Sequence, residues 1–115
     1  MLRHKIITDF GSLKDWELNM KAQHIISYMS GNIHFSNTVP SLTSIKIAKA
    51  AYQIALAKIP SDEWEDMEEK KHARKKLEDL LTLLGHFVQL FSNQNIAIMQ
   101  SSSFEIIEES DSANL

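Results

Sequence analysis

One apolar stripe constrains the fold of this chain more than any other feature. It occupies residues 73–91, where apolar side chains recur at alternating steps of four and three: Ala73, Leu77, Leu80, Leu84, Phe87 and Phe91. This spacing is typical of one face of a helix and lies close to the seam of a coiled coil. Leu81, Leu83 and Val88 widen the stripe, so the helix needs apolar partners on more than one side.

The helix that carries the stripe is expected to run from Ser61 to about Asn93. Ser61 can accept a hydrogen bond from an unpaired amide of the first turn, and at ~1.5 Å per residue the helix would be ~48 Å long. Trp64 and Met67 are out of register with the later stripe. The helix is therefore either interrupted near Glu69, or these two side chains cover a different neighbour.

Two shorter helices and a brief fourth one are predicted in the rest of the chain. Apolar side chains follow helical spacing over residues 13–30 and 42–59, and residues 96–99 form a short helix or turn. The expected fold is all-α: an antiparallel three-helix bundle with one long C-terminal helix and a short fourth helical piece. Residues 1–107 would form a single helical domain, and residues 108–115 a disordered acidic tail.

The composition bounds the class of protein. The chain has 115 residues, of which 43% are hydrophobic, enough for one domain with a core. It has no Cys, which excludes disulfides, thiolate zinc sites and cysteine nucleophiles. The first ten residues lack the apolar run of a signal peptide, and no stretch approaches the ~20 apolar residues of a membrane span. We therefore expect a cytoplasmic or particle-associated protein without membrane contact.

Charge is unevenly placed along the chain. Residues 1–59 carry seven Lys/Arg against three Asp/Glu, a balance of +4, and residues 60–115 carry five against twelve, a balance of −7. Halves of opposite charge can attract one another within a fold or between subunits. The basic cluster, defined as Lys70, Lys71, Arg74, Lys75 and Lys76, could contact phosphates. The acids one turn before it would repel the same phosphates, so nucleic-acid binding is an alternative and not the leading hypothesis.

No residue pattern in the chain predicts catalysis, a metal site or a bound cofactor. The five histidines show no i,i+4 pairing with each other and no HExxH arrangement: His4, His24, His34, His72 and His86. The acidic residues 62–69 lie on an expected helix, whereas calcium loops need a turn that contains Gly. Residues 101–103, three serines, lack the pattern of a nucleophile elbow. We expect a protein that is not an enzyme.

Four segments carry a resemblance to known proteins. In order, they are Ile26–Phe35 (ISYMSGNIHF), Val39–Leu42 (VPSL), Ala73–Leu77 (ARKKL) and Ser102–Glu105 (SSFE). Together they resemble a family of small bacterial proteins of unknown function with an N-terminal helical module. In longer members of this family, a fibronectin type III-like domain often follows the module. Ser36, Thr38 and Ser103 depart from the family pattern, which has prolines and a glycine there. The resemblance covers most of residues 18–105 and implies a helical module without a known active site.

The width of the apolar stripe indicates a function in assembly. Two shorter helices cannot cover it, so we expect a non-catalytic interaction module that self-associates. Such a module could be a structural or accessory component of a phage or multiprotein particle. The residues expected at the interface are Trp64, Met67, Leu83, Phe87 and Phe91. The alternative is a nucleic-acid-associated helical protein. Its phosphate contacts would be Lys70, Lys71, Arg74 and Lys75.

Overall fold

The computed structural model describes residues 2–60 and 62–110. The elements follow in the order β1 (Leu2–Ile6), α1 (Asp15–Met29), α2 (Leu42–Ala57), α3 (Trp64–Ser92), α4 (Ile96–Gln100) and β2 (Ile106–Ser110). The described chain is thus mostly helical, as expected, with four helices. The prediction of an all-α fold is wrong, because the two ends of the chain pair as a small antiparallel sheet.

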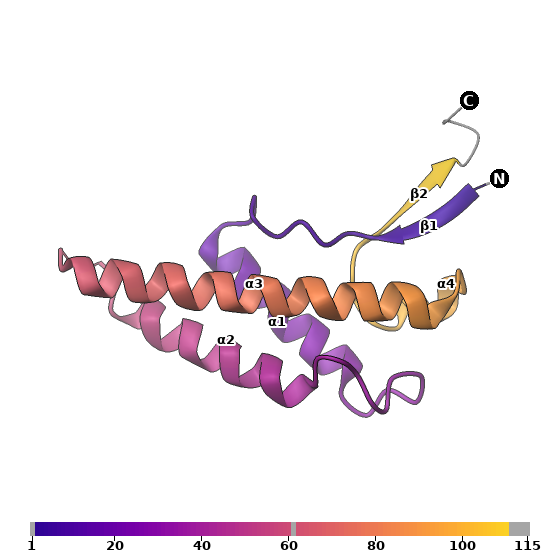
Figure 1. Cartoon of the computed structure of the whole chain (residues 1–115), viewed down its shortest axis with the longest axis horizontal. Helices are drawn as coiled ribbons and strands as arrows, with labels where there is room; N and C mark the ends of the chain where they lie inside the picture. Colours follow the sequence, from indigo (N-terminus) through magenta and orange to yellow (C-terminus); the bar gives the residue numbers. More distant parts are fainter. Residues whose placement is uncertain (1, 61, 111–115) are drawn as a thin grey trace.

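Helix α3 is the longest element and runs along most of the molecule (Figure 1). Its 29 residues span ~43 Å and continue through Glu69 without interruption. Asn93 ends the helix with a φ of 46°, in the left-handed conformation that often closes helices. The helix starts three residues later than expected, after Glu63, and the predicted cap Ser61 lies outside the described residues. The prediction of one long helix is confirmed.

The buried face of α3 is rotated relative to the predicted stripe. Leu77 and Leu84 are fully buried, as expected, but Leu81 and Val88 are equally buried and lie at the centre of the face. Phe91, in contrast, is 54% exposed. The rotation follows from how the neighbours are placed, because the core lies on one side of α3 and leaves a flank of the stripe open.

The three longer helices do not form a regular bundle. Helix α2 runs antiparallel to α3 along its first half, and α1 crosses behind α3 (Figure 1). The molecule measures 52 × 36 × 18 Å. Because a helix with its side chains is ~10 Å across, the thin dimension holds only two layers of helix. The core between the layers is apolar, with residues from α1 (Leu18, Ala22, Ile25, Met29) and α2 (Ile45, Tyr52, Ala55) against α3.

The β1–β2 sheet was not expected from the sequence. His4 lies opposite Glu108, and Arg3 lies opposite Glu109, so basic residues of one strand face acidic residues of the other. The prediction of a disordered tail from Glu108 onward is therefore wrong for residues 108–110, which form part of β2; residues 111–115 lie outside the described residues. The acidic composition concealed a strand whose partner lies about a hundred residues away.

The N-terminal segment packs onto α3 at Gly85. A Cβ atom at this position would lie 2.6 Å from Cγ2 of Thr8 and 3.3 Å from Cε1 of Phe104. Ile6 and Phe10, which precede α1, are 3% and 4% exposed, so this segment belongs to the core. A glycine within a helix costs ~1 kcal/mol relative to alanine, and here it provides the space in which both ends of the chain cross α3.

Candidate functional site

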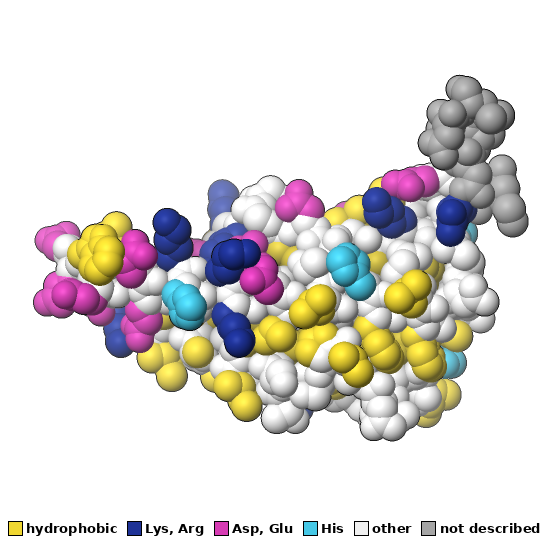
Figure 2. Space-filling model, viewed as in Figure 1, with side chains coloured by type: hydrophobic (Ala, Val, Ile, Leu, Met, Phe, Trp, Pro, Cys, Tyr) yellow, Lys and Arg dark blue, Asp and Glu magenta, His cyan; other side chains and the backbone are white. Residues whose placement is uncertain are grey.

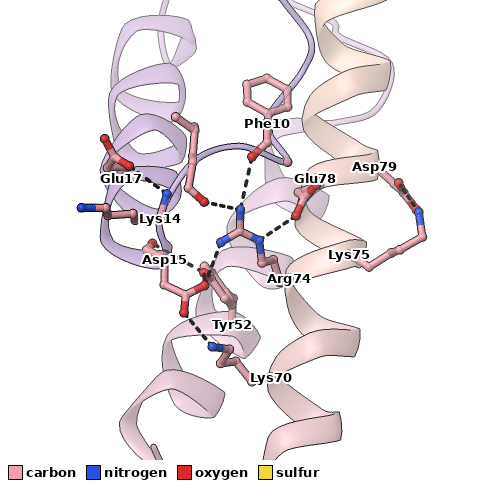
Figure 3. A network of polar contacts seen from close by, with 12 residues as sticks. Phe10, Lys14, Asp15, Glu17, Tyr52, Lys70, Arg74, Lys75, Glu78 and Asp79 are labelled. Atoms are coloured by element: carbon pink, nitrogen blue, oxygen red, sulfur yellow. Dashed lines mark hydrogen bonds and ion pairs between the residues drawn. The ribbon is translucent and has the colours of Figure 1, made fainter.

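A cluster of polar side chains joins the three longer helices near the start of α1 (Figure 3). Asp15, in the first turn of α1, accepts hydrogen bonds from three groups: Arg74 Nη1 at 2.8 Å, Lys70 Nζ at 2.7 Å and the hydroxyl of Tyr52. Arg74 Nε also donates to Glu78 Oε2 at 2.7 Å. We call these five residues, Asp15, Tyr52, Lys70, Arg74 and Glu78, the polar cluster.

Arg74 is the centre of the polar cluster. Its Nη2 atom donates to the carbonyl oxygens of Leu13 at 2.6 Å and Phe10 at 3.2 Å. These two carbonyls belong to the turn that leads into α1, which begins at Asp15, two residues after the predicted start at Leu13. One guanidinium group therefore holds the N-terminal segment, α1 and α3 together through directional hydrogen bonds.

The ionisation of the polar cluster follows from these contacts. Burial alone would raise the pKa of Asp15, but hydrogen bonds from Lys70, Tyr52 and Arg74 outweigh it and lower the pKa to about 2. Burial and the neighbouring Asp15 carboxylate both raise the pKa of the Tyr52 hydroxyl. Burial opposes the charge of Arg74, whereas its hydrogen bonds with Asp15 and Glu78 raise its pKa. All three groups therefore keep their usual charge at neutral pH.

This arrangement supports structure rather than catalysis. A general acid or base needs a pKa near the working pH, and the shifts in the polar cluster move away from neutrality. Each charged group already contacts a partner of opposite charge within the chain. We infer that the cluster fixes the angle at which α1 crosses the other helices.

Most of the basic cluster is engaged within the chain. Lys70 and Arg74 bind Asp15, and Lys75 pairs with Asp79 at 3.1 Å. Lys71 is exposed. The four side chains suggested as phosphate contacts are therefore not presented as one open patch, because a phosphate would compete with carboxylates for three of them.

The exposed apolar surface is concentrated along one side of α3 and α2. On α3, Leu83 and Phe91 are each 54% exposed and Leu90 is 81% exposed. On α2, Ile47 and Ile54 are 67% and 61% exposed. Figure 2 shows hydrophobic side chains along the lower side of the second half of α3 and again over α2. We call these five residues, together with the half-buried Phe87, the apolar band.

A groove between α2 and α3 lies next to the α2 part of the apolar band. It has a volume of about 320 Å³ and is lined by Ala48, Ala51, Glu69, His72, Ala73 and Lys76. Ala51 lies one helical turn from both Ile47 and Ile54. On α3, Lys76 and Leu83 follow His72 by four and eleven residues, so all three lie on the same face of the helix. Glu69, His72 and Lys76 therefore lie between the α2 part and the α3 part of the band.

Aromatic rings form the far end of the apolar band. Phe87 and Phe91 stack with ring centroids 5.6 Å apart, and Phe35 packs against Phe91 at 5.5 Å. Phe35 is 3% exposed and comes from the loop between α1 and α2. A pocket of about 200 Å³ opens here between the rings and residues 34–37. Contacts within the chain thus hold the rings in place.

The structure divides the residues predicted for an interface. Leu83, Phe87 and Phe91 lie together, but Trp64 and Met67 do not join them. At ~100° per residue, Met67 lies ~160° and Trp64 ~100° around the helix from Leu83. Both are exposed, at 54% and 69%. The five residues therefore do not form a single patch, and whether any of them contacts a partner stays a prediction.

Some residues that organise these sites could not be recognised beforehand. The i,i+4 spacing of Arg74 and Glu78 was a usable signal for their ion pair. No local pattern linked Asp15 to Arg74, which lies 59 residues further along the chain. Ile47, Ile54 and Leu90 were not predicted at the interface, because none of them belongs to the apolar stripe of residues 73–91.

The described residues contain no group of three or more His, Asp or Glu side chains placed to hold a metal ion. None of the helices in residues 2–60 and 62–110 combines the length and apolar character needed to cross a bilayer. Comparisons with protein families, curated proteins and solved structures found no match to this chain. The resemblance to small bacterial proteins with a helical module thus stays a prediction.

Proposed function

We propose that this protein is a non-catalytic assembly module and that two copies associate through the apolar band. The observation that carries the proposal is the exposure of five large apolar side chains along one side of α2 and α3, each more than half exposed. Large exposed apolar side chains gathered on one side of a small protein often mark an interaction site.

The size of the apolar band suits a modest but specific interface. At roughly 100 Å² of accessible apolar area per side chain, five residues offer about 500 Å² per copy. A two-fold contact would bury about 1,000 Å² of apolar surface before its polar rim is counted, which reaches the range of stable interfaces. A two-fold contact uses the same patch on both copies, so a second copy covers the band completely.

Apolar contact, rather than charge, would dominate this association. The opposite charges of the two halves of the sequence also suggested a contact between copies, with acids at residues 62–69 of one copy near bases at residues 70–76, or near the first helix, of another. Lys70, Arg74 and Lys75 already bind carboxylates of their own chain, which removes much of that attraction. The association is therefore expected to persist at high salt.

The test compares two substitutions of similar chemistry, one within the apolar band and one outside it. Leu90→Asp places a charge in the apolar band at a residue that is 81% exposed, so the fold should tolerate it. Met20→Asp is the control, because Met20 is 50% exposed on α1, outside the band. Sedimentation equilibrium should show dimers for the native chain and Met20→Asp, and monomers for Leu90→Asp. Equal dissociation constants for all three proteins would contradict the proposal.

A module of this kind suits an accessory component of a larger particle, such as a phage or another multiprotein complex, in the cytoplasm. The alternative, phosphate binding by the basic cluster, has less support because three of the four suggested side chains are ion-paired. Filter binding of labelled nucleic acid over a range of salt concentrations distinguishes the two, since phosphate contact weakens steeply with salt.

A further inference from the structure

The β1–β2 sheet has two outer edges, and α3 closes one of them. On the β1 edge, the amide of His4 donates to Oε1 of Gln94 at 2.7 Å, and the amide of Ile6 donates to Oε1 of Gln89 at 2.6 Å. Both glutamine Nε2 atoms donate in return to the carbonyl oxygen of His4 at 3.0 Å. Two side-chain amides thus take the place that a neighbouring strand would occupy.

The outer edge of β2 has no such cover within the described residues. The amide of Ile7 donates to the carbonyl of Glu105 at 2.8 Å, so the backbone of Glu105 faces β1. In an antiparallel ladder the direction of the backbone groups alternates. The groups that point away from β1 therefore belong to Ile106, Glu108 and Ser110. In residues 2–60 and 62–110, no side chain or strand bonds to the outward amides of Ile106 and Glu108.

The charges on the sheet show which kind of strand β2 accepts. Its only described neighbour, β1, is basic, with the sequence Leu-Arg-His-Lys-Ile. Glu108 lies 3.3 Å from Nε2 of His4, and Glu109 lies 3.8 Å from Nζ of Lys5. The side chains of both glutamates remain more than half exposed, at 60% and 53%. They can therefore meet a second basic strand on the other side.

We propose that the outer edge of β2 docks an extended segment of a partner protein that carries Lys or Arg, which adds a third strand to the sheet. Exposed backbone donors and acceptors on an edge strand are a template for such strand addition. Glu108 and Glu109 point to opposite faces of the sheet, as do their partners His4 and Lys5 on β1. Basic side chains at alternate positions of the partner would therefore face one of the two glutamates, and basic side chains at consecutive positions would face both.

A second copy of this chain is a poor occupant for the same edge. Pairing two β2 strands antiparallel brings the acidic residues 105, 108 and 109 of both copies close together, and like charges across a ladder are destabilising. The outer edge of β1 in another copy is already occupied by Gln89 and Gln94. This docking site is therefore separate from the apolar band and independent of self-association.

The direct test uses a fluorescent peptide that alternates Val with Lys. Its matched controls are a peptide with Glu in place of Lys and a Val–Lys peptide methylated at every second backbone nitrogen. Fluorescence anisotropy should show salt-sensitive binding of the unmethylated Val–Lys peptide and no binding of the Val–Glu peptide. The methylated peptide keeps the charge but loses the backbone donors, so it should bind roughly tenfold or more weakly.

Two variants at one position locate the site. Glu108→Pro removes an outward amide without removing a donor to β1, because the amide of Glu108 points away from β1. Glu108→Gln keeps that amide and removes only the charge. Peptide affinity should fall modestly for Glu108→Gln and by a further factor of roughly ten for Glu108→Pro.

Hydrogen exchange followed by NMR gives the pattern that strand addition requires. On adding the basic peptide, the amides of Ile106 and Glu108 should gain protection, while those of Ile107 and Glu109 should be protected before and after. Equal binding of the methylated peptide, peptide-induced changes centred on residues 62–69, or protection of Ile106 and Glu108 without peptide would each overturn the proposal.

Discussion

The Asp15 carboxylate offers the sharpest test of how the helices are held together. In Asp15→Asn the side chain keeps its shape but loses its charge, and one of its two acceptor oxygens is replaced by an NH2 donor that cannot accept from Lys70 or Arg74. Folding lowers the pKa of Asp15 from 3.8 to about 2. At 1.36 kcal/mol per pKa unit this corresponds to ~2.4 kcal/mol. Because the side chain is 32% exposed, solvent screening reduces the expected effect to ~1.5 kcal/mol.

The sign of the pH dependence is also determined. A carboxylate with a lowered pKa stabilises the folded state fully above its unfolded pKa, near 4, and this stabilisation is lost as the pH falls toward 2. With an unfolding entropy of ~2.1 cal/mol/K per residue, the loss of ~1.5 kcal/mol lowers the melting temperature of this domain by ~6 °C. We expect this difference between native chain and Asp15→Asn at pH 7, and almost none near pH 2.

Thermal unfolding followed by circular dichroism measures both quantities. Asp79→Asn is the matched control, because Asp79 also pairs with a lysine but its side chain is 60% exposed. An exposed pair of this kind contributes ~0.5 kcal/mol or less, so the control should melt within ~2 °C of the native chain. If Asp15→Asn melts at the native temperature at pH 7, or loses as much stability at pH 2 as at pH 7, the structural role of the polar cluster is refuted.

Three further predictions concern the core and the sheet. Leu84→Asp should abolish the helical circular dichroism signal, because an unpaired charge at a fully buried position costs several kcal/mol; retained helicity with a native melting temperature would show that the position is open. Gly85→Leu should lower stability by ~1–3 kcal/mol in chemical denaturation, since Thr8 would have to move; an unchanged midpoint would refute this packing. Deleting residues 108–115 should lower the melting temperature, because β2 loses its pairing with β1, and an unchanged temperature would return these residues to the status of a tail.

Residues with helical periodicity were predictable because the signal is local. The stripe of residues 73–91 defined α3, and helical spacing over residues 42–59 located α2. The structure adds the cap of α2, where Ser41 Oγ accepts from the amide of Ser44 at 3.2 Å. The centre of the buried face was harder to place. A stripe as wide as this one allows several orientations, and only the position of α1 and α2 decides that Leu81 is buried and Leu83 is exposed.

The sheet and the polar cluster depend on contacts between residues that lie far apart in the sequence. β1 and β2 are five residues each and lie at opposite ends of the chain, and their charges hide their strand character. Gln89 was indistinguishable from any polar residue on a helix, although it closes the edge of β1. Long-range pairs of this kind follow from tertiary structure and leave only weak local patterns.

Intermolecular distances between spin labels test the assembly proposal most directly. The chain has no Cys, so a single introduced cysteine carries a unique label. His86→Cys places the label on α3 beside the apolar band, and Gln23→Cys places it on the exposed surface of α1. Pulsed dipolar spectroscopy should show coupling between two copies for both proteins, with the shorter distance for His86→Cys. No coupling between copies, or a shorter distance from α1, would contradict association through the apolar band.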